Sequence, residues 1–121
     1  MDGLHLTADL NGVAPGLRAM DDPQALRECC LGAVVQAGLQ PVGQLFHRFP
    51  AAGGVTGVVL LAESHLAVHT WPELGAVTLD VYVCNYGGDN SGRAQALLDA
   101  LVAAFAPRAV ERRALRRGAP A

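Results

Sequence analysis

The sequence predicts an α+β fold, a two-layer sandwich in which an antiparallel sheet carries two helices on one face. Three observations lead to this prediction. Segments of alternating apolar and polar residues recur along the chain, a pattern typical of half-buried strands. Two other segments repeat their apolar residues at helical spacing. The strand-like segments in the middle of the chain are joined by links of hairpin length, which indicates antiparallel pairing.

The first third of the chain predicts a strand followed by a helix. Residues 3–10 alternate in polarity, and the residues expected to share one face are Leu4, Leu6, Ala8 and Leu10. Residues 11–21 are rich in Gly, Pro, Asn and Asp, which is typical of a loop. Asp22 then precedes a proline, as an N-cap precedes the first helical position, so we expect an amphipathic helix over residues 23–37.

Four strands are expected in the middle of the chain, at residues 39–49, 55–62, 65–71 and 76–84. Proline and glycine separate them, because proline ends the first and third of these strands and the small residues 51–54 predict a turn. Short links of this kind join neighbouring antiparallel strands.

The last third of the chain predicts a second helix over about residues 92–105, ended by Pro107. Its apolar stripe consists of Ala94, Leu97, Leu98, Leu101, Val102 and Phe105. The arginine-rich segment from Val110 onward predicts an edge strand, since a charged edge strand limits pairing between sheets. An RNA- or phosphate-binding tail is the alternative for these arginines.

The composition predicts a single domain and excludes several classes of chemistry. The chain has 121 residues, is 51% hydrophobic and carries a formal net charge of −2, which argues against disorder and against a general electrostatic footprint for nucleic acid. All basic residues are arginine. A Schiff-base lysine, a pyridoxal-phosphate anchor and a P-loop are therefore excluded, and a carbonyl for amine chemistry must have another source.

Three cysteines, Cys29, Cys30 and Cys84, form no paired spacing, which favours reduced thiols over a disulfide framework. The first residues lack the basic and apolar regions of a signal peptide, and no apolar run reaches the length of a membrane span. We therefore expect a soluble, cytoplasmic protein that binds neither membranes nor nucleic acid. The small size favours a homo-oligomer.

Reactive side chains gather in one short stretch of the chain. They are Glu63, Ser64, His65, His69, Glu73 and Cys84, and they fall at the ends of adjacent predicted strands, where we expect one pocket. Two alternatives explain the same residues. Glu-Ser-His is also a reasonable hairpin tip with local hydrogen bonds. A zinc site formed by the two histidines and Cys84 is the other, although the chain has neither an HExxH nor a CxxC motif.

The string that begins at Glu63, E-S-H-L-A-V-H-T-W-P-E, resembles the S-adenosylmethionine decarboxylase proenzyme family in its prokaryotic short form. The opening G-L-H-L, the upstream runs F-H-R-F and G-V-T-G-V-V, Asp80 and Cys84 fit the same family. The resemblance covers about residues 3–105.

The resemblance implies self-cleavage between Glu63 and Ser64 into a β chain, residues 1–63, and an α chain, residues 64–121. Ser64 would become a pyruvoyl group, the cofactor that forms a Schiff base with the substrate amine. His69 matches the family histidine that acts as the processing base. Cys84 matches the cysteine that returns a proton to the substrate carbon.

The resemblance also implies a substrate site and an assembly. Phe49, Trp71 and Glu73 match substrate-binding positions, and the enzyme would be a homodimer of cleaved protomers that supplies the aminopropyl donor for spermidine biosynthesis. Thr56 stands where the family usually has a serine that supports processing, and it keeps the hydroxyl on a stiffer side chain.

The loop Asn85–Asn90 departs from the family pattern, and it leaves two further functions open. The same chemistry could act on a free basic amino acid, ornithine or arginine, with Asp89 or Glu73 binding the distal cation. An uncleaved, non-catalytic or metal-binding homologue is the other alternative.

Overall fold

The computed structural model describes residues 1–51 and 53–118 and confirms the predicted α+β sandwich. The strands are β1 (Asp2–Asn11), β2 (Pro41–Arg48), β3 (Val55–Leu61), β4 (Ser64–Trp71), β5 (Ala76–Cys84) and β6 (Ala109–Gly118). The helices are α1 (Pro23–Gln36) and α2 (Ser91–Phe105), with short 3-10 turns η1 (Arg18–Met20) and η2 (Pro72–Leu74). The predicted turn 51–54 and the predicted domain 1–121 include residues 52 and 119–121, which lie outside the described residues.

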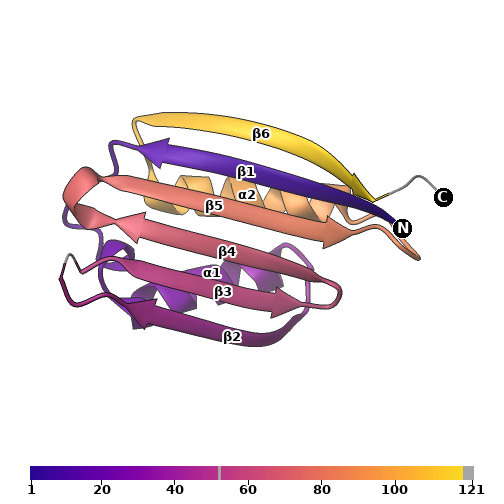
Figure 1. Cartoon of the computed structure of the whole chain (residues 1–121), viewed down its shortest axis with the longest axis horizontal. Coiled ribbons are helices and arrows are strands. Elements are labelled where there is room, and N and C mark those ends of the chain that lie inside the picture. Colours follow the sequence, from indigo (N-terminus) through magenta and orange to yellow (C-terminus); the bar gives the residue numbers. More distant parts are fainter. Residues whose placement is uncertain (52, 119–121) are drawn as a thin grey trace.

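The strands form one antiparallel sheet in the order β2-β3-β4-β5-β1-β6 (Figure 1). The strands from β2 to β5 are sequential neighbours, as the hairpin-length links predict. The N-terminal strand β1 lies between β5 and β6, a pairing that no local pattern indicated. The expected edge strand β6 is present, and all of its residues are exposed.

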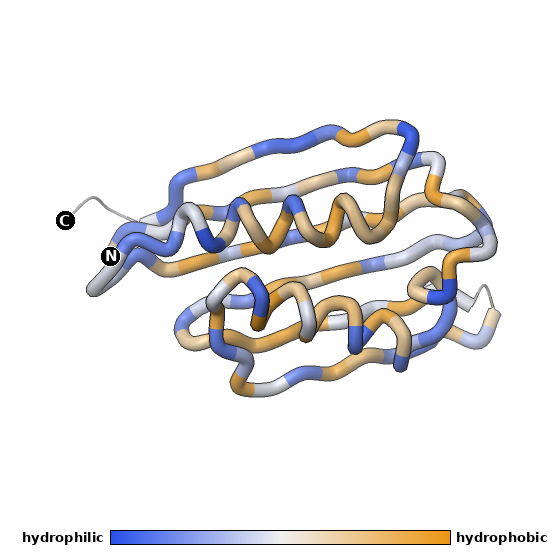
Figure 2. Tube along the Cα trace, turned by 180° about the vertical axis from the view of Figure 1, so that it is seen from behind, coloured by the Kyte–Doolittle hydropathy of each residue, from blue (hydrophilic) through white to orange (hydrophobic). Residues whose placement is uncertain are grey.

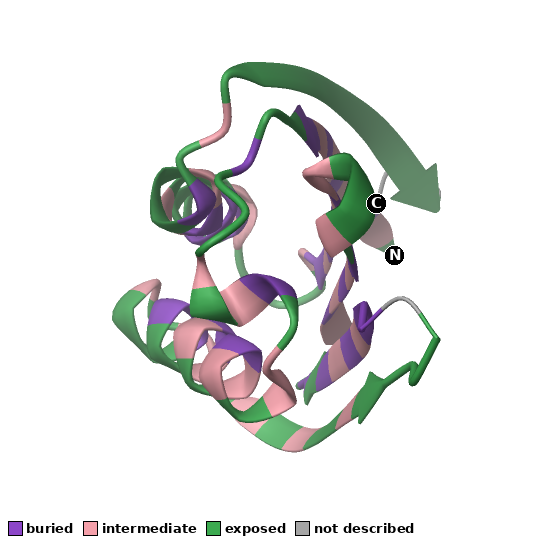
Figure 3. Ribbon diagram, turned by 90° about the vertical axis from the view of Figure 1, so that its left-hand side faces the viewer, coloured by how far each residue is buried: buried purple, intermediate pink, exposed green. Residues whose placement is uncertain are grey.

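Both helices cover the same face of the sheet, and the other face is open (Figure 3). Helix α1 packs against β2 and β3, while α2 packs against β1 and β5. Apolar segments recur along both helices (Figure 2), and the buried helix residues include Leu26, Cys30, Val34, Leu97, Leu101 and Phe105. The predicted apolar faces are confirmed, apart from Leu4, Cys29 and Val102, which are only partly buried.

Local caps set the helix bounds close to the predicted ones. Asp22 accepts hydrogen bonds from the backbone N–H groups of Gln24 and Ala25, which confirms the predicted N-cap. Helix α1 ends one residue earlier than predicted, at Gln36, and the strand β2 begins two residues later, at Pro41. The reason is the left-handed Gly38, with φ 82°, which follows the C-cap Ala37 and whose N–H donates to the carbonyl of Val35.

Two of the three cysteines, Cys29 and Cys30, lie on α1 and belong to the core. Cys30 is fully buried between α1 and the sheet, and this burial raises the pKa of its thiol far above the ordinary value. Partial burial raises the pKa of Cys29 as well. Both thiols therefore stay protonated and act as core side chains, as expected from the sequence.

Within the described residues no helix is both long and apolar enough to cross a bilayer.

A buried hydroxyl fastens the sheet to the loop before α1. Thr70 is 4% exposed, and its Oγ1 accepts a hydrogen bond from the N–H of Val55 (2.9 Å) and donates one to the carbonyl of Met20 (2.7 Å). One side chain on β4 thus satisfies two buried backbone groups, one on β3 and one on η1.

Replacing this hydroxyl is expected to destabilise the fold. Thr70→Val keeps the shape but leaves the Val55 N–H and the Met20 carbonyl without a partner, so we expect the free energy of unfolding to fall by about 1–3 kcal/mol. Urea denaturation of the purified chain measures this loss. Thr70→Ser keeps the hydroxyl and should lose clearly less stability; equal losses in the two variants would contradict the assignment.

Candidate active site

The bond expected to be cleaved lies in a tight hairpin. Leu61 at the end of β3 pairs with Ser64 at the start of β4, so Ala62 and Glu63 form a two-residue loop. Glu63 has φ 55°, a left-handed conformation that costs a non-glycine residue of the order of 1–3 kcal/mol. The Glu63–Ser64 peptide bond therefore follows directly on a strained residue.

Ser64 and Cys84 lie together at this end of the sheet. The backbone N–H of Cys84 donates a hydrogen bond to the Ser64 Oγ at 3.2 Å. The Cys84 side chain is nearly buried, and its Sγ accepts a hydrogen bond from the N–H of Tyr86 at 3.4 Å. This hydrogen bond fixes the position of the Cys84 sulfur at the start of the loop that follows β5.

Two asparagines hold the loop after Cys84 in place, a role that the sequence analysis missed. The Asn90 side chain donates to the carbonyl of Cys84 (2.9 Å), and its N–H donates to Oδ1 of Asn85 (2.8 Å). Asn85 in turn donates to the Ser91 hydroxyl (3.2 Å) at the start of α2. Asparagines on both sides of a Gly-Gly pair were the available signal, because asparagine side chains often bond to nearby backbone.

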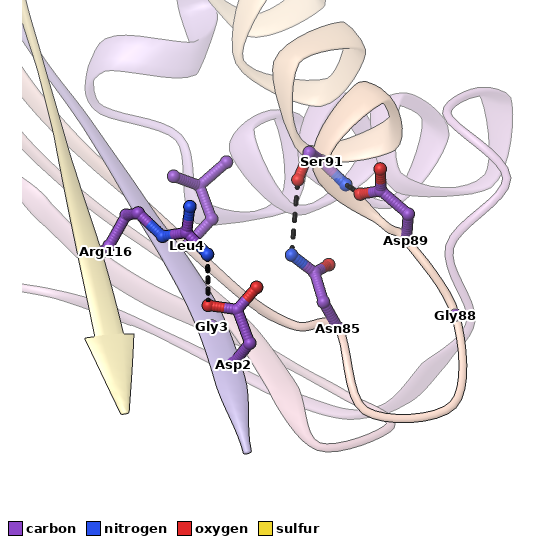
Figure 4. A pocket seen from close by; sticks show the side chains of 8 residues that line it. All are labelled: Asp2, Gly3, Leu4, Asn85, Gly88, Asp89, Ser91 and Arg116. Atoms are coloured by element: carbon purple, nitrogen blue, oxygen red, sulfur yellow. Dashed lines mark hydrogen bonds and ion pairs between the residues drawn. The ribbon is translucent and has the colours of Figure 1, made fainter. Parts of the chain in front are cut away.

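A cavity of about 470 Å³ opens beside this loop (Figure 4). Its lining residues are Asp2, Gly3, Leu4, Asn85, Gly88, Asp89, Ser91 and Arg116. Figure 4 shows Arg116 directed at Asp2, with which it forms an ion pair at 2.8 Å. Asp89 accepts from the N–H of Ser91, and hydrogen bonds from Ser91 lower the pKa of this carboxyl. Asp89 is thus occupied at the start of α2, which weakens its case as a partner for a basic amino acid.

The remaining predicted site residues form a second group at the opposite end of the sheet. Phe49, Thr56, His69, Trp71 and Glu73 line a cavity of about 160 Å³ together with Gly54 and Thr70. The Thr56 Oγ1 lies 3.1 Å from Nδ1 of His69, and the His69 ring stacks on Trp71. When Nδ1 carries the proton and donates it to Thr56, Nε2 keeps a free lone pair and can act as a base.

The two groups cannot meet within one chain. Ser64 pairs with Leu61 at one end of β4, whereas His69 pairs with Thr56 toward the other end. Five residues of strand span roughly 16 Å, and an odd spacing places their side chains on opposite faces. The expectation of one pocket is therefore not met within one chain: Ser64 and Cys84 lie together, and His69 and Thr56 lie together elsewhere.

The open face carries a further polar cluster that the sequence analysis did not anticipate. His5 Nε2 lies 3.1 Å from Oδ1 of Asp80, and His65 stacks on Tyr82 with 5.6 Å between ring centroids. His65 and His69 thus contact different neighbours. Among residues 1–51 and 53–118, no group of three or more His, Cys, Asp or Glu side chains could hold a metal ion, so the zinc alternative finds no support.

Three of the four arginines of β6, Arg112, Arg113 and Arg116, are paired with carboxylates of their own chain. Arg112 bonds to Asp99 at 2.7 Å, and Arg113 bonds to Asp9 at 3.0 Å and to Glu111 at 2.7 Å. This neutralisation favours the solvated edge strand over an RNA- or phosphate-binding tail.

Comparisons with known proteins give a consistent result. The family model described as S-adenosylmethionine decarboxylase matches residues 4–118. A proenzyme of that name from Aquifex aeolicus is 40% identical over 96% of this chain and 81% of its own length, and one from Symbiobacterium thermophilum is 42% identical over 98% and 85%.

The fold agrees with the sequence matches. The crystal structure of the adenosylmethionine decarboxylase from Aquifex aeolicus superposes with a TM-score of 0.87 and 37% identity, over 98% of this chain and 92% of that one. The hairpin at Glu63–Ser64, the adjacent Cys84 and the matches over nearly the whole length agree with the resemblance drawn from the E-S-H string, and this chain belongs to the S-adenosylmethionine decarboxylase proenzyme family.

Proposed function

We propose that this chain is the self-cleaving precursor of a pyruvoyl-dependent S-adenosylmethionine decarboxylase, active as a homodimer of cleaved protomers, that supplies the aminopropyl donor for spermidine biosynthesis. The observation that carries the proposal is the position of Ser64, next to a strained residue and with its hydroxyl in contact with Cys84. Family membership supports the same assignment.

Cleavage begins with attack of the Ser64 hydroxyl on the carbonyl carbon of Glu63. The peptide C–N bond breaks as the ester C–O bond forms, and the hydroxyl proton passes to the nitrogen. A base then removes the Ser64 α-proton, and the Cβ–O bond breaks to release Glu63 as a carboxylate. Tautomerisation and hydrolysis by water release ammonia and leave a keto group. Breaking the bond also relieves the strain at Glu63.

The residues at the hairpin fit a pyruvoyl group. The serine at position 64 provides the three carbons of the pyruvoyl group. The chain has no lysine whose amine could compete with the substrate for the pyruvoyl carbonyl. The pyruvoyl carbonyl, once formed, supplies the electron sink for decarboxylation. Cys84 returns a proton to the former α-carbon, because its Sγ lies in this corner of the sheet and its loop is fixed by Asn85 and Asn90.

The base must come from a second copy of the chain. His69, held by Thr56, is the base that the resemblance implies, and it lies five strand residues from Ser64. Ser64 and His69 flank Ala67 on β4. A two-fold axis that lies between two facing sheets and crosses the strands at Ala67 exchanges the two ends of β4. The His69 end of one copy then lies over the Ser64 end of the other, where His69 faces His65, the residue next to Ser64, because the Ser64 side chain itself lies on the helix-covered side of β4.

The pairing of neighbouring strands defines a row of residues on the open face, and the proposed two-fold axis runs along this row. Cross-strand neighbours of Ala67 continue from β2 to β6 as Leu45, Val58, Ala67, Asp80, Thr7 and Arg113. We call this set the central row. In the homodimer each residue of the central row faces its own counterpart, and residues on one side of the row face those on the other side.

The open face has the character of a surface that a second copy covers. Leu45 on the edge strand β2 is 69% exposed, and Leu60 on β3 is 50% exposed, although both lie in strands of the sheet rather than in loops. Contiguous exposed apolar residues of this kind mark interaction sites. A second copy would bury them and would bring Phe49, Trp71 and Glu73 of the partner to Ser64. Aromatic rings suit a purine, and a carboxylate suits ribose hydroxyls.

The assignment is tested by cleavage and by release of carbon dioxide. Purified protein should separate on a denaturing gel into residues 1–63 and 64–121, with the second fragment blocked to Edman sequencing by the pyruvoyl group. Carboxyl-labelled S-adenosylmethionine should release labelled carbon dioxide, whereas labelled ornithine and arginine should not. Ser64→Ala should remain one chain without activity. An uncleaved wild type that retains activity, or release from a free amino acid alone, would overturn the proposal.

Mixing two inactive variants tests the composite site. Ser64→Ala keeps His69, and His69→Ala keeps Ser64, so neither homodimer has both groups at one site. The mixed dimer has one complete site, and we expect the His69→Ala chain to be cleaved after mixing, as followed by mass spectrometry. Mixing His69→Ala with the double variant Ser64→Ala/His69→Ala is the control and should give no cleavage. Equal cleavage in both mixtures would contradict a base from the partner.

Replacing the thiol should separate cleavage from catalysis. Cys84→Ala should still form the two fragments, because the thiol acts on the substrate carbon. Decarboxylation should fall by about 10²–10⁴-fold, the usual loss for a positioned proton donor. Cys29→Ala is the matched control and should retain turnover. Near-wild-type turnover by a fully cleaved Cys84→Ala variant would show that another group is the acid.

A further inference from the structure

We propose that His5 and Asp80 are a positioning pair for self-cleavage. The pair neutralises charge at the centre of the dimer interface. Association of the two copies therefore weakens as the pH rises through the range where histidine loses its charge. The pair acts through the homodimer proposed above, on which this inference rests. Neither residue belongs to the group predicted from the E-S-H string to carry out cleavage or decarboxylation.

The position of Asp80 follows from strand register. Asp80 pairs with Ala67 of β4 on one side and with Thr7 of β1 on the other, so it belongs to the central row. Its side chain lies on the open face and is 35% exposed. In the homodimer the carboxylate of Asp80 faces the same carboxylate of the second copy. Two like charges that lose water at an interface disfavour association unless each is neutralised.

His5 is the group placed to neutralise Asp80. Its Nε2 lies 3.1 Å from the Asp80 carboxylate, and its side chain is only 24% exposed. The other titratable or charged groups on this face are His47, His65, His69, Tyr82, Cys84, Asp9, Glu111, Arg113 and Arg117.

The nearby cations are engaged elsewhere. Arg113 shares the central row, but it is bonded to Asp9 and Glu111. Arg117 lies over the ring of Tyr82, 6.0 Å from its centroid. Among the described residues, His5 is therefore the group in contact with the Asp80 carboxylate that can carry a balancing charge.

The direction of the pH effect follows from this pairing. With His5 protonated, each copy presents a neutral pair and the two pairs can face each other. With His5 neutral, two carboxylates face each other, so association takes up protons and is lost as the pH rises. On the acidic side a second contact opposes the effect. The arrangement places His65 opposite the partner subunit's His69, and two protonated rings repel, so association should be strongest at an intermediate pH.

Association can be measured without cleavage in the full chain carrying Ser64→Ala. Analytical ultracentrifugation at about pH 6.5 and about pH 8.5 should show the dimer dissociation constant rising by about tenfold, within the usual range for coupled equilibria. Adding Asp80→Asn should retain the dimer and abolish this rise between the two pH values. Adding His5→Gln should weaken the dimer already at the lower pH, because Asp80 is then never neutralised.

The double variant His5→Gln/Asp80→Asn, also in the Ser64→Ala chain, separates charge from packing. We expect it to recover the dimer that His5→Gln loses, since no carboxylate remains to be neutralised; a merely structural role for His5 would give no recovery. Asp99→Asn on α2, an ion-paired aspartate away from this face, is the matched control and should leave the pH dependence unchanged. Circular dichroism checks that each variant is folded.

Two outcomes distinguish the inference from the proposed function. A dimer whose pH dependence survives Asp80→Asn would overturn the role of the pair, while cleavage and decarboxylation by the wild type would still support the proposed function. A Ser64→Ala chain that is monomeric at every pH, together with wild-type cleavage at a rate independent of protein concentration, would overturn both the homodimer and the role of the pair.

Discussion

The antiparallel register of β4 between β3 and β5 is the constraint on which the rest of the structure depends. It places Ser64 beside the hairpin at one end of the strand and His69 beside Thr56 toward the other end. Because a strand is extended and its side chains alternate, no local adjustment brings these residues together. The division of the site into two groups follows from this register, and the proposed homodimer and the proposed self-facing position of Asp80 both depend on it.

The two-layer architecture explains why a second copy has a place to bind. Both helices lie on one face of the sheet, where they bury the apolar residues of alternate strand positions (Figure 3). The other positions point to the open face, where apolar side chains such as Leu45 and Leu60 lie beside histidines and Asp80. A face of this mixed kind is stable in water yet gains from being covered, which suits the proposed association of two copies.

Strain and hydrogen bonding have distinct roles at the reactive end of the sheet. The left-handed backbone at Glu63 stores free energy next to the bond that breaks, and a two-residue loop gives that residue little freedom to relax. The hydrogen bonds around Cys84 act in the opposite sense, because they fix a loop that contains two consecutive glycines. One corner of the fold thus holds both the strained Glu63 next to Ser64 and the fixed Cys84 thiol, the two features that the proposed mechanism uses.

The sequence alone determined the elements, the buried face of most of them and the group at Ser64 and Cys84. The alternation of apolar and polar residues revealed the strands, and Asp22 with its proline revealed the start of α1. The absence of lysine and the E-S-H string together indicated the class of chemistry. Each of these signals is local, because it depends on neighbours within a few residues. Only the tertiary structure decided that β1 lies between β5 and β6, that His69 is remote from Ser64 and that His5 contacts Asp80. Strand pairing joins residues far apart in the chain through backbone hydrogen bonds common to all residue types, so the sequence pattern shows which face a side chain occupies but not which distant strand lies beside it.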